Sequence, residues 1–188
     1  MCIRDRDKIK EIVKNLWQDY TGKDIVDTNY KIYRQIRNNI KITVRKDNKE
    51  DFDFVKLIDF EHPENNTFTA VSQMWIQGKV YDRRPDILIF INGMPIVFIE
   101  LKNSIVKIEE AYNKNLKDYL QDVSNLFAFN QICVLSNGLE TKLGAFNATY
   151  DYFFEWLKVD SEKEVLLSLI HISQDTKLTI SIRMLNKS

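Results

Sequence analysis

The sequence predicts an α/β fold in which a mixed β-sheet is flanked by helices. Apolar runs rich in β-branched and aromatic residues recur along the chain and predict strands. Residues 103–122 instead carry apolar side chains at three- and four-residue steps, which predicts a helix between two of those strands. About 160 residues remain once both ends are set aside for the reason given below, which is the size of one domain with its own hydrophobic core.

The other elements expected from the sequence surround one central hairpin. Residues 8–20 carry apolar side chains on one face and predict an amphipathic helix that ends at Thr21-Gly22. Alternation predicts strands at 40–45, 52–58 and 67–76, with a solvated charged loop over 46–51. After the helix at 103–122 we expect a strand at 131–135, a turn at Asn137-Gly138 and a helix over the aromatic residues 150–156.

The central hairpin is the best-defined element. Two apolar, β-branched runs at 87–91 and 96–99 flank Asn92-Gly93-Met94-Pro95, which are residues typical of a turn. A loop centred on Gly93 places Asp86 directly opposite Glu100, with Cβ atoms roughly 4.5–5.5 Å apart. A two-residue Asn-Gly turn instead places Asp86 opposite Ile99, with Glu100 as a neighbour. The sequence does not decide between these registers, but both bring two carboxylates together.

A lysine belongs to the same group of side chains. Glu100 and Lys102 are two residues apart on a strand, so their side chains leave the same face, whereas Leu101 points to the other. Two carboxylates at such a distance repel each other unless a proton or a cation lies between them. Carboxylate oxygens suit Mg²⁺ or Mn²⁺, a metal-bound water can attack a phosphodiester, and a nearby ammonium stabilises the developing charge. The pattern therefore predicts metal-assisted hydrolysis.

A simpler interpretation competes with this one. Asp86 can begin a strand as a solvated turn residue, and Glu100 with Lys102 can form an ordinary surface ion pair; for an isolated pattern of this kind that is the commoner outcome. Strands as apolar as 87–91 and 96–99 are, however, expected to be buried on both faces, and a buried sheet seldom carries charge without a function. The site therefore stands as the working hypothesis.

At this point the residues resemble a known family. The matching segments are Arg84-Pro85-Asp86, Asn92-Gly93-Met94-Pro95 and Ile99-Glu100-Leu101-Lys102-Asn103, with further matches at Asp59-Phe60, 63–66, Gln73, Leu126-Phe127, Ser136-Asn137-Gly138 and Gly144. Together they resemble the nuclease domain, of the PD-(D/E)xK superfamily, in the restriction (R) subunit of type I restriction-modification enzymes. The resemblance covers roughly residues 36–157 and implies a restriction-endonuclease-like fold.

The resemblance also implies roles for individual residues. Asp86 and Glu100 would hold a divalent metal, Mg²⁺ or Mn²⁺, with the Leu101 carbonyl as a further ligand and Lys102 as the catalytic lysine. Such subunits carry a Gln-x-x-x-Tyr element on the following helix, linked to DNA handling. Tyr119 matches the tyrosine, whereas Asn115 stands at the glutamine position with a shorter side chain. On a helix Asn115 and Tyr119 are neighbours, although Tyr119 could equally pack the helix onto the sheet.

Both ends of the chain contain segments that do not look biological. Residues 1–6 match the translation of a transposase adapter used in sequencing libraries, and residues 167–173 match the translation of its reverse complement. We therefore expect one nuclease domain over 7–166 and give residues 174–188 no interpretation. Five of the 27 basic and two of the 27 acidic residues lie outside 7–166. The domain therefore holds 22 basic and 25 acidic residues. A protein that binds DNA tightly alone usually shows a basic surplus.

Several classes of site are excluded. No Gly-x-x-x-x-Gly-Lys-Ser/Thr loop is present, so any ATP dependence implied by the resemblance belongs to helicase-like motor domains elsewhere in a longer polypeptide. Cys133 lies in an apolar run and is expected to be a buried hydrophobe. His62 is the one histidine outside the adapter-like segments, which argues against a histidine metal site or a serine triad. No membrane span or secretory signal is visible, and we expect a prokaryotic cytoplasmic protein.

Two classes of function follow. The first is a Mg²⁺-dependent endonuclease domain that cleaves double-stranded DNA without sequence choice. The resemblance implies that cleavage follows ATP-driven translocation and that the domain acts in a complex with methyltransferase (M) and specificity (S) subunits. The second is a non-catalytic docking or regulatory module of the same complex, favoured by the weak positive charge and by Asn115. A DNA-repair nuclease of the same superfamily is a further alternative. The segments 92–95 and 136–138 argue against it.

Overall fold

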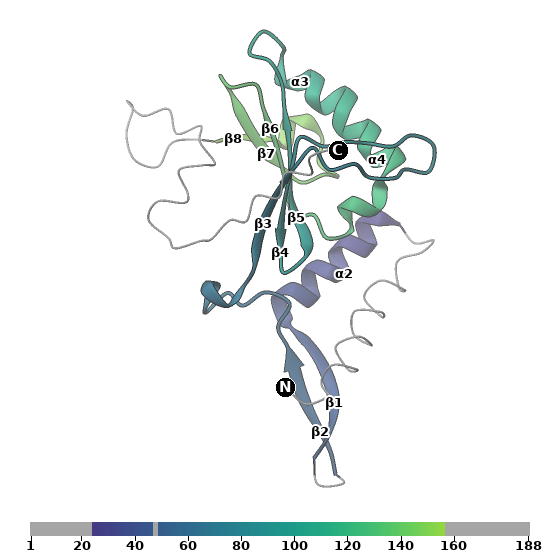
Figure 1. Ribbon diagram of the computed structural model, residues 1–188, viewed down its shortest axis with the longest axis vertical. Helices are drawn as coiled ribbons and strands as arrows, with labels where there is room; N and C mark the ends of the chain where they lie inside the picture. The colour runs from purple at the N-terminus through teal and green to yellow at the C-terminus, as the bar shows by residue number, and fades with distance from the viewer. Residues whose placement is uncertain (1–23, 47–48, 157–188) are drawn as a thin grey trace, which may run out of the picture.

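The computed structural model of the chain describes residues 24–46 and 49–156 (Figure 1). The predicted helix at 8–20, the adapter-like segments and residues 174–188 lie outside the described residues. Within them the chain forms a six-stranded sheet, a separate two-stranded hairpin and helices against the main sheet. The fold is α/β with a mixed sheet, as the sequence predicts. No helix in the described ranges is both long and apolar enough to span a lipid bilayer.

The main sheet places the predicted hairpin near its centre. Its strands lie in the order β3-β4-β5-β6-β7-β8. They are β3 Phe68–Ser72, β4 Ile87–Ile91, β5 Met94–Leu101, β6 Ile132–Ser136, β7 Thr141–Gly144 and β8 Phe154–Glu155. All neighbours are antiparallel except β5 and β6, which run parallel. A parallel pair needs a long crossover, and here the crossover carries the helix that covers the site.

The crossover helix runs from Ile108 to Asp122 in three parts: α3 Ile108–Glu110, a π-helical segment Ala111–Leu116, and α4 Lys117–Asp122. Ala111 and Leu116 are both fully buried although they are five residues apart. The i→i+5 pattern of the π-helical segment accommodates this spacing, so residues on both sides of it face the same core. A short 3₁₀-helix, Ser124–Ala128, follows.

The predicted start of this helix at residue 103 is wrong. Residues 103–107 form a turn in which the Asn103 side chain accepts a hydrogen bond from the Ile105 amide at 3.1 Å and the Asn103 carbonyl accepts one from Val106. The Ile105 side chain is 89% exposed and does not belong to the apolar face of the helix. An asparagine that bonds its own backbone competes with helix formation, and this explains the later start at Ile108.

Helix α2, Ile25–Asn38, is not among the elements expected from the sequence. The Asp24 side chain caps it by accepting a hydrogen bond from the Val26 amide at 2.7 Å, and Ile32 and Ile36 are buried on its inner face. This cap and the four-residue step between the two isoleucines were the available signals. Asn29 fixes the helix to the 3₁₀-helix and the residues after it, because its side-chain amide donates to the carbonyls of Phe127, Ala128 and Asn130 at 2.6–3.2 Å.

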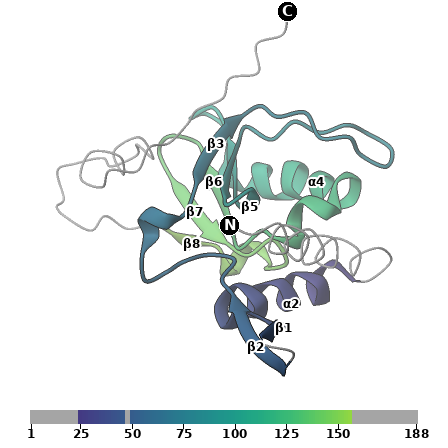
Figure 2. The same ribbon diagram turned by 60° about the horizontal axis from the view of Figure 1, so that its bottom comes forward.

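Two apolar clusters hold helices against the sheet. The larger joins the sheet to the crossover helix and includes Leu88, Phe98, Leu116, Phe127 and Leu135. The smaller joins the sheet to α2 and includes Ile32, Ile36, Met94, Ile96 and Phe129. Figure 2 shows α2 and α4 as two separate helices beside the strands. Cys133 lies in the larger cluster, and burial raises the pKa of its thiol, as expected of a buried hydrophobe.

Two peripheral elements differ from expectation. The hairpin of β1 Ile40–Lys46 and β2 Lys49–Val55 extends away from the main sheet (Figure 1), and its strands run further into the predicted charged loop. The aromatic segment 150–156, predicted to be a helix, is a 3₁₀ turn at Tyr150–Tyr152 followed by β8. The buried Phe153 ring packs edge-on against Tyr112, while Phe154 is exposed, and this alternation suits a strand at the sheet edge.

Candidate active site

The turn of the central hairpin contains two residues. Ile91 pairs with Met94, and Asn92 and Gly93 both have positive φ angles, 51° and 82°. Positive φ at both positions is the geometry of a type I′ turn, which asparagine and glycine favour. The Asn92 side chain holds the turn in place by accepting from the Thr67 amide at 2.8 Å and donating to the Leu57 carbonyl at 2.9 Å.

A β-bulge then corrects the register. Phe90 pairs with Pro95, but Ile89 pairs with Val97, so Ile96 is an extra residue in β5. Proline, which has no amide hydrogen, is tolerated next to such a bulge. Beyond the bulge Ile87 pairs with Ile99, and one further step along this register places Asp86 opposite Glu100. The predicted opposition of the two carboxylates therefore holds, through a two-residue turn and a bulge that the sequence analysis did not combine.

Asp86 is fixed by the backbone on both sides. Its Oδ2 atom accepts a hydrogen bond from the Leu101 amide at 2.8 Å, and its carbonyl accepts one from the Gln73 amide at 2.9 Å. The side chain is therefore tied to β5, one residue beyond Glu100. The Leu101 carbonyl, which the resemblance suggests as a metal ligand, belongs to the residue whose amide holds Asp86.

Glu100 is the most deeply buried charged group of the site, with 3% of its surface exposed. Its Oε1 atom accepts hydrogen bonds from Asn115 Nδ2 at 2.6 Å and from Lys102 Nζ at 3.1 Å, whereas Oε2 is buried without a hydrogen-bond partner. Burial and, next, the charge of Asp86 raise the pKa of Glu100 to about 7, against the opposing effects of Lys102 and Tyr119. A buried carboxylate oxygen without a partner beside a second carboxylate indicates a place for a cation.

Lys102 completes the group on β5. Its amide donates to the Ser136 carbonyl of β6 at 2.7 Å, which fixes the backbone, and its half-buried side chain turns back to Glu100. Lys102 and Glu100 therefore share one face, as the two-residue spacing predicts. The three residues of the predicted catalytic group come together at the end of β5.

The crossover helix contributes Asn115 and Tyr119 to the same place. Asn115 lies in the π-helical segment and Tyr119 in α4. Tyr119 is buried with its ring edge-on to Phe98 at 5.1 Å between centroids. Burial and, next, the charge of Glu100 raise the pKa of its hydroxyl. Tyr119 therefore packs the helix onto the sheet and lies close to Glu100, while its role in DNA handling stays a prediction.

A buried ion pair links the segment before Asp86 to the same helix. Arg83 Nε donates to Asp122 Oδ2 at 2.6 Å, and its Nη2 lies 3.3 Å from Asp118 Oδ2. The Lys79 amide also donates to the Asp122 carbonyl at 3.1 Å. No signal in the sequence relates Arg83 to Asp122, because the two residues are 39 positions apart.

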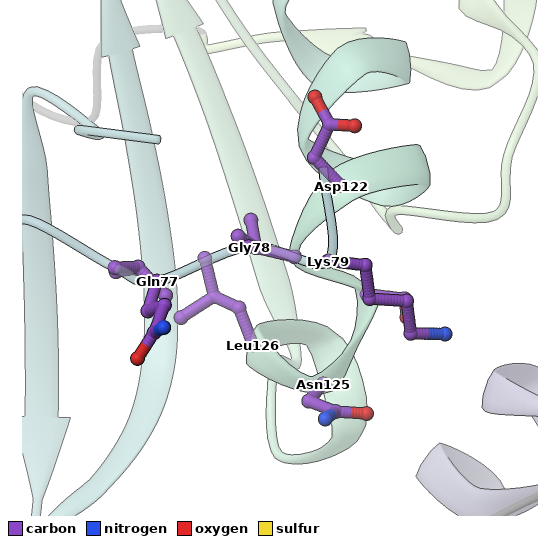
Figure 3. A pocket seen from close by; sticks show the side chains of 9 residues that line it. Gln77, Gly78, Lys79, Asp122, Asn125 and Leu126 are labelled. Carbon is purple, nitrogen blue, oxygen red and sulfur yellow. The ribbon is translucent and has the colours of Figure 1, made fainter. Parts of the chain in front are cut away.

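Residues 73–86 form a hairpin-like extension, here called the arm. Ile76 and Arg83 exchange two backbone hydrogen bonds, and the arm reaches past α4 in Figure 1. Where it meets the end of α4 a cavity of about 250 Å³ is lined by Gln77, Lys79, Asp122, Asn125 and Leu126 (Figure 3). The Lys79 side chain is directed away from Asp122. The arm is therefore held to α4 by its backbone and by Arg83.

A second acidic group lies elsewhere, at Asp59, Glu61 and His62. The side-chain amide of Asn65 and the amide of His62 bond Asp59 and lower its pKa to about 2, and Lys56 pairs with Glu61 at 2.6 Å. These are the contacts of a loop that folds on itself. We therefore assign it no ligand.

Comparison with known proteins finds similar endonuclease subunits of type I restriction enzymes. The chain is 31% identical over 160 residues to the type I restriction enzyme HindI endonuclease subunit of Haemophilus influenzae, covering 83% of this chain and 15% of that protein. It is 33% identical over 164 residues to the MjaIXP endonuclease subunit of Methanocaldococcus jannaschii, covering 83% and 16%. The chain thus spans about a sixth of the length of these relatives. The profile of the family described as type I restriction enzyme R protein N terminus matches residues 2–152, and the chain belongs to that family.

Proposed function

We propose that this chain is the metal-dependent endonuclease domain of a type I restriction enzyme R subunit, hydrolysing phosphodiester bonds of double-stranded DNA. The observation that carries the proposal is the buried, unpartnered Oε2 atom of Glu100, opposite Asp86 and beside Lys102. Asp86 and Glu100 would hold Mg²⁺, or Mn²⁺ in its place, with the Leu101 carbonyl as an additional ligand. A bound divalent ion would supply Lewis acidity and a water of lowered pKa.

The protein groups have separate tasks in this reaction. The Leu101 amide holds Asp86, and the Asn115 amide holds Oε1 of Glu100, so both carboxylates are oriented before DNA arrives. The Lys102 ammonium, 3.1 Å from the same Oε1 atom, is placed to stabilise negative charge that develops on the phosphate. Tyr119 is buried on the crossover helix, and its hydroxyl lies close enough to Glu100 to influence the pKa of that carboxyl.

The remaining parts of the proposed activity involve other domains and subunits. Cleavage without sequence choice would follow ATP-driven translocation by helicase-like motor domains, and a complex with M and S subunits would select the DNA. The protein groups at the site suit this division of work, because carboxylates, an amine and an amide can recognise a phosphodiester and a metal but not a base sequence.

Metal binding tests the proposal directly. Calorimetric titration of the chain with Mn²⁺ should detect a site in the wild type that disappears in Glu100→Ala and Asp86→Ala. Glu109→Ala is the control, because Glu109 is an exposed glutamate on the crossover helix, outside the group formed by Asp86, Glu100 and Lys102. A folded wild-type chain that binds no Mn²⁺ but binds an M subunit would favour the docking module instead. Cleavage by a full-length R subunit carrying Lys102→Ala should fall by about 100-fold or more.

A further inference from the structure

We propose that Trp75 and Arg84, an exposed pair at the base of the arm, contact the sugar-phosphate backbone of duplex DNA beside the candidate active site. The inference rests on the proposed function, because it concerns how the same site holds its substrate. It adds a surface that lies outside the group formed by Asp86, Glu100, Lys102, Asn115 and Tyr119.

The two residues face each other across the arm. The hydrogen bond from Gln73 to Asp86 and the two between Ile76 and Arg83 define one register, and in that register Trp75 lies opposite Arg84. The Arg84 guanidinium lies 5.2 Å from the centroid of the Trp75 ring, within the range of a cation–π contact. The Trp75 side chain is 54% exposed and Arg84 is exposed as well. The structure thus presents a guanidinium on an aromatic ring at the surface.

The neighbouring arginine shows that this exposure is specific to Arg84. Arg83 turns to α4 and is neutralised by Asp122 and Asp118. Successive side chains in an extended segment point in opposite directions, so Arg84 points away from that helix. Arg83 fixes the arm to the body of the domain, whereas no carboxylate among the described residues pairs with Arg84, whose charge can therefore meet an external anion.

Position links the pair to the site. Arg84 is two residues before Asp86, which places their Cα atoms about 7 Å apart in extended chain. A phosphate bound by Arg84 would therefore lie within one or two nucleotides of a phosphodiester bound at Asp86. The planar guanidinium can bind phosphate oxygens through two parallel hydrogen bonds, and the ring beneath it restricts its orientation. Such contacts position a duplex without reading its sequence, which suits cleavage without sequence choice.

The test measures DNA binding separately from cleavage. Fluorescence anisotropy of a labelled duplex with the full chain would be recorded in Ca²⁺, at low salt and at increasing salt. We expect Arg84→Gln to weaken binding and to reduce the slope of log affinity against log salt by about one. Trp75→Ala should weaken binding about fivefold or more because Arg84 loses the ring that orients it, and Trp75→Phe, which keeps a ring, should retain most of the affinity. Arg34→Gln, which removes an exposed arginine on α2, is the control and should bind like the wild type.

The outcomes separate this inference from the proposed function. Circular dichroism would first establish that Arg84→Gln and Trp75→Ala are folded. If these two variants then bind DNA like Arg34→Gln, the arm is not a DNA contact, even if Glu100→Ala still abolishes Mn²⁺ binding. The same result is expected if the pair instead docks against a protein. If the arm variants lose DNA affinity while the wild-type chain binds no Mn²⁺, the DNA contact is supported and the proposed metal-dependent chemistry is contradicted. Arg84→Lys should recover the salt slope but only part of the affinity, because lysine keeps the charge without the planar fork.

Discussion

The side-chain amide of Asn115 lies 2.6 Å from Oε1 of Glu100 and connects the crossover helix to the acidic end of β5. A glutamine at this position would have one more methylene, and the π-helical segment brings the shorter side chain within reach. The contact leaves Oε2 of Glu100 as the carboxylate oxygen without a hydrogen-bond partner.

Asn115→Ala should therefore lower Mn²⁺ affinity by about tenfold to a hundredfold, because Glu100 loses a group that orients it. Asn113→Ala is the control, since Asn113 is exposed two residues earlier and its oxygen accepts from Lys117. Calorimetry on both variants makes the comparison. Equal affinities in the two would mean that Asn115 does not orient the ligand.

The raised pKa of Glu100 predicts how stability depends on pH when metal is removed. The folded state holds a proton on Glu100 up to about pH 7, whereas the unfolded chain releases it near its ordinary value of 4.5. The stabilisation is thus fully present below pH 4.5 and is lost as pH rises through 7, by on the order of 3 kcal/mol. Thermal unfolding in EDTA should show this loss in the wild type.

Glu100→Gln provides the comparison for that experiment, because its amide carries no proton to release. The difference in stability between the variant and the wild type should grow from pH 5 to pH 8. Added Mn²⁺ should restore the wild type alone. Parallel pH profiles for the two proteins would show that Glu100 ionises at an ordinary pKa.

The two acidic partners of Arg83 should differ strongly in their contribution to folding. The Asp122 side chain is 2% exposed and Asp118 is 50% exposed, although both contact the same guanidinium. Asp122→Ala leaves the half-buried Arg83 without its main partner and should cost about 3 kcal/mol. Asp118→Ala should cost less than about 1 kcal/mol. Urea unfolding of both variants measures the difference, and equal losses would contradict the assigned burial.

Gly78 allows the arm to approach the end of α4. A Cβ atom at this position would lie 1.9 Å from the Tyr81 carbonyl oxygen and 3.2 Å from the Asp122 carbonyl oxygen. Gly78→Ala should therefore displace the arm and cost about 1–3 kcal/mol. Hydrogen exchange at the Lys79 amide, which bonds the Asp122 carbonyl, should become faster. Lys79→Ala changes only an exposed side chain and should leave that amide protected.

Local patterns made the centre of the fold predictable. The strands on both sides of Asn92-Gly93, the buried residues Ile108, Leu116 and Tyr119, and the shared face of Glu100 and Lys102 all follow from short-range spacing. The opposition of Asp86 and Glu100 was within reach as one of two registers. The bulge at Ile96 was not, because it depends on how β5 packs against its neighbours and not on the turn residues.

Other features depended on partners distant in sequence. Phe153 enters the core beside Tyr112, which turned a segment dense with aromatic residues into a turn and an edge strand. The bond between Arg83 and Asp122 and the exposure of Arg84 appear only when the arm lies against α4. Helix α2 was missed because polar residues outnumber apolar ones along it, and Ile32 and Ile36 are the two apolar residues among its three buried ones, the third being Thr28.

The turn at Asn92-Gly93 and the bulge at Ile96 together hold the same number of residues as a three-residue loop without a bulge. The number of residues between the two carboxylates thus keeps them aligned. How those residues are divided between the turn and the bulge can vary without changing this alignment. Moving one residue from the bulge into the turn would leave Asp86 opposite Glu100 while exchanging the faces to which Met94 and Pro95 point. The packing of the tip against α2 and the chemistry at the other end of the hairpin can therefore change independently of each other.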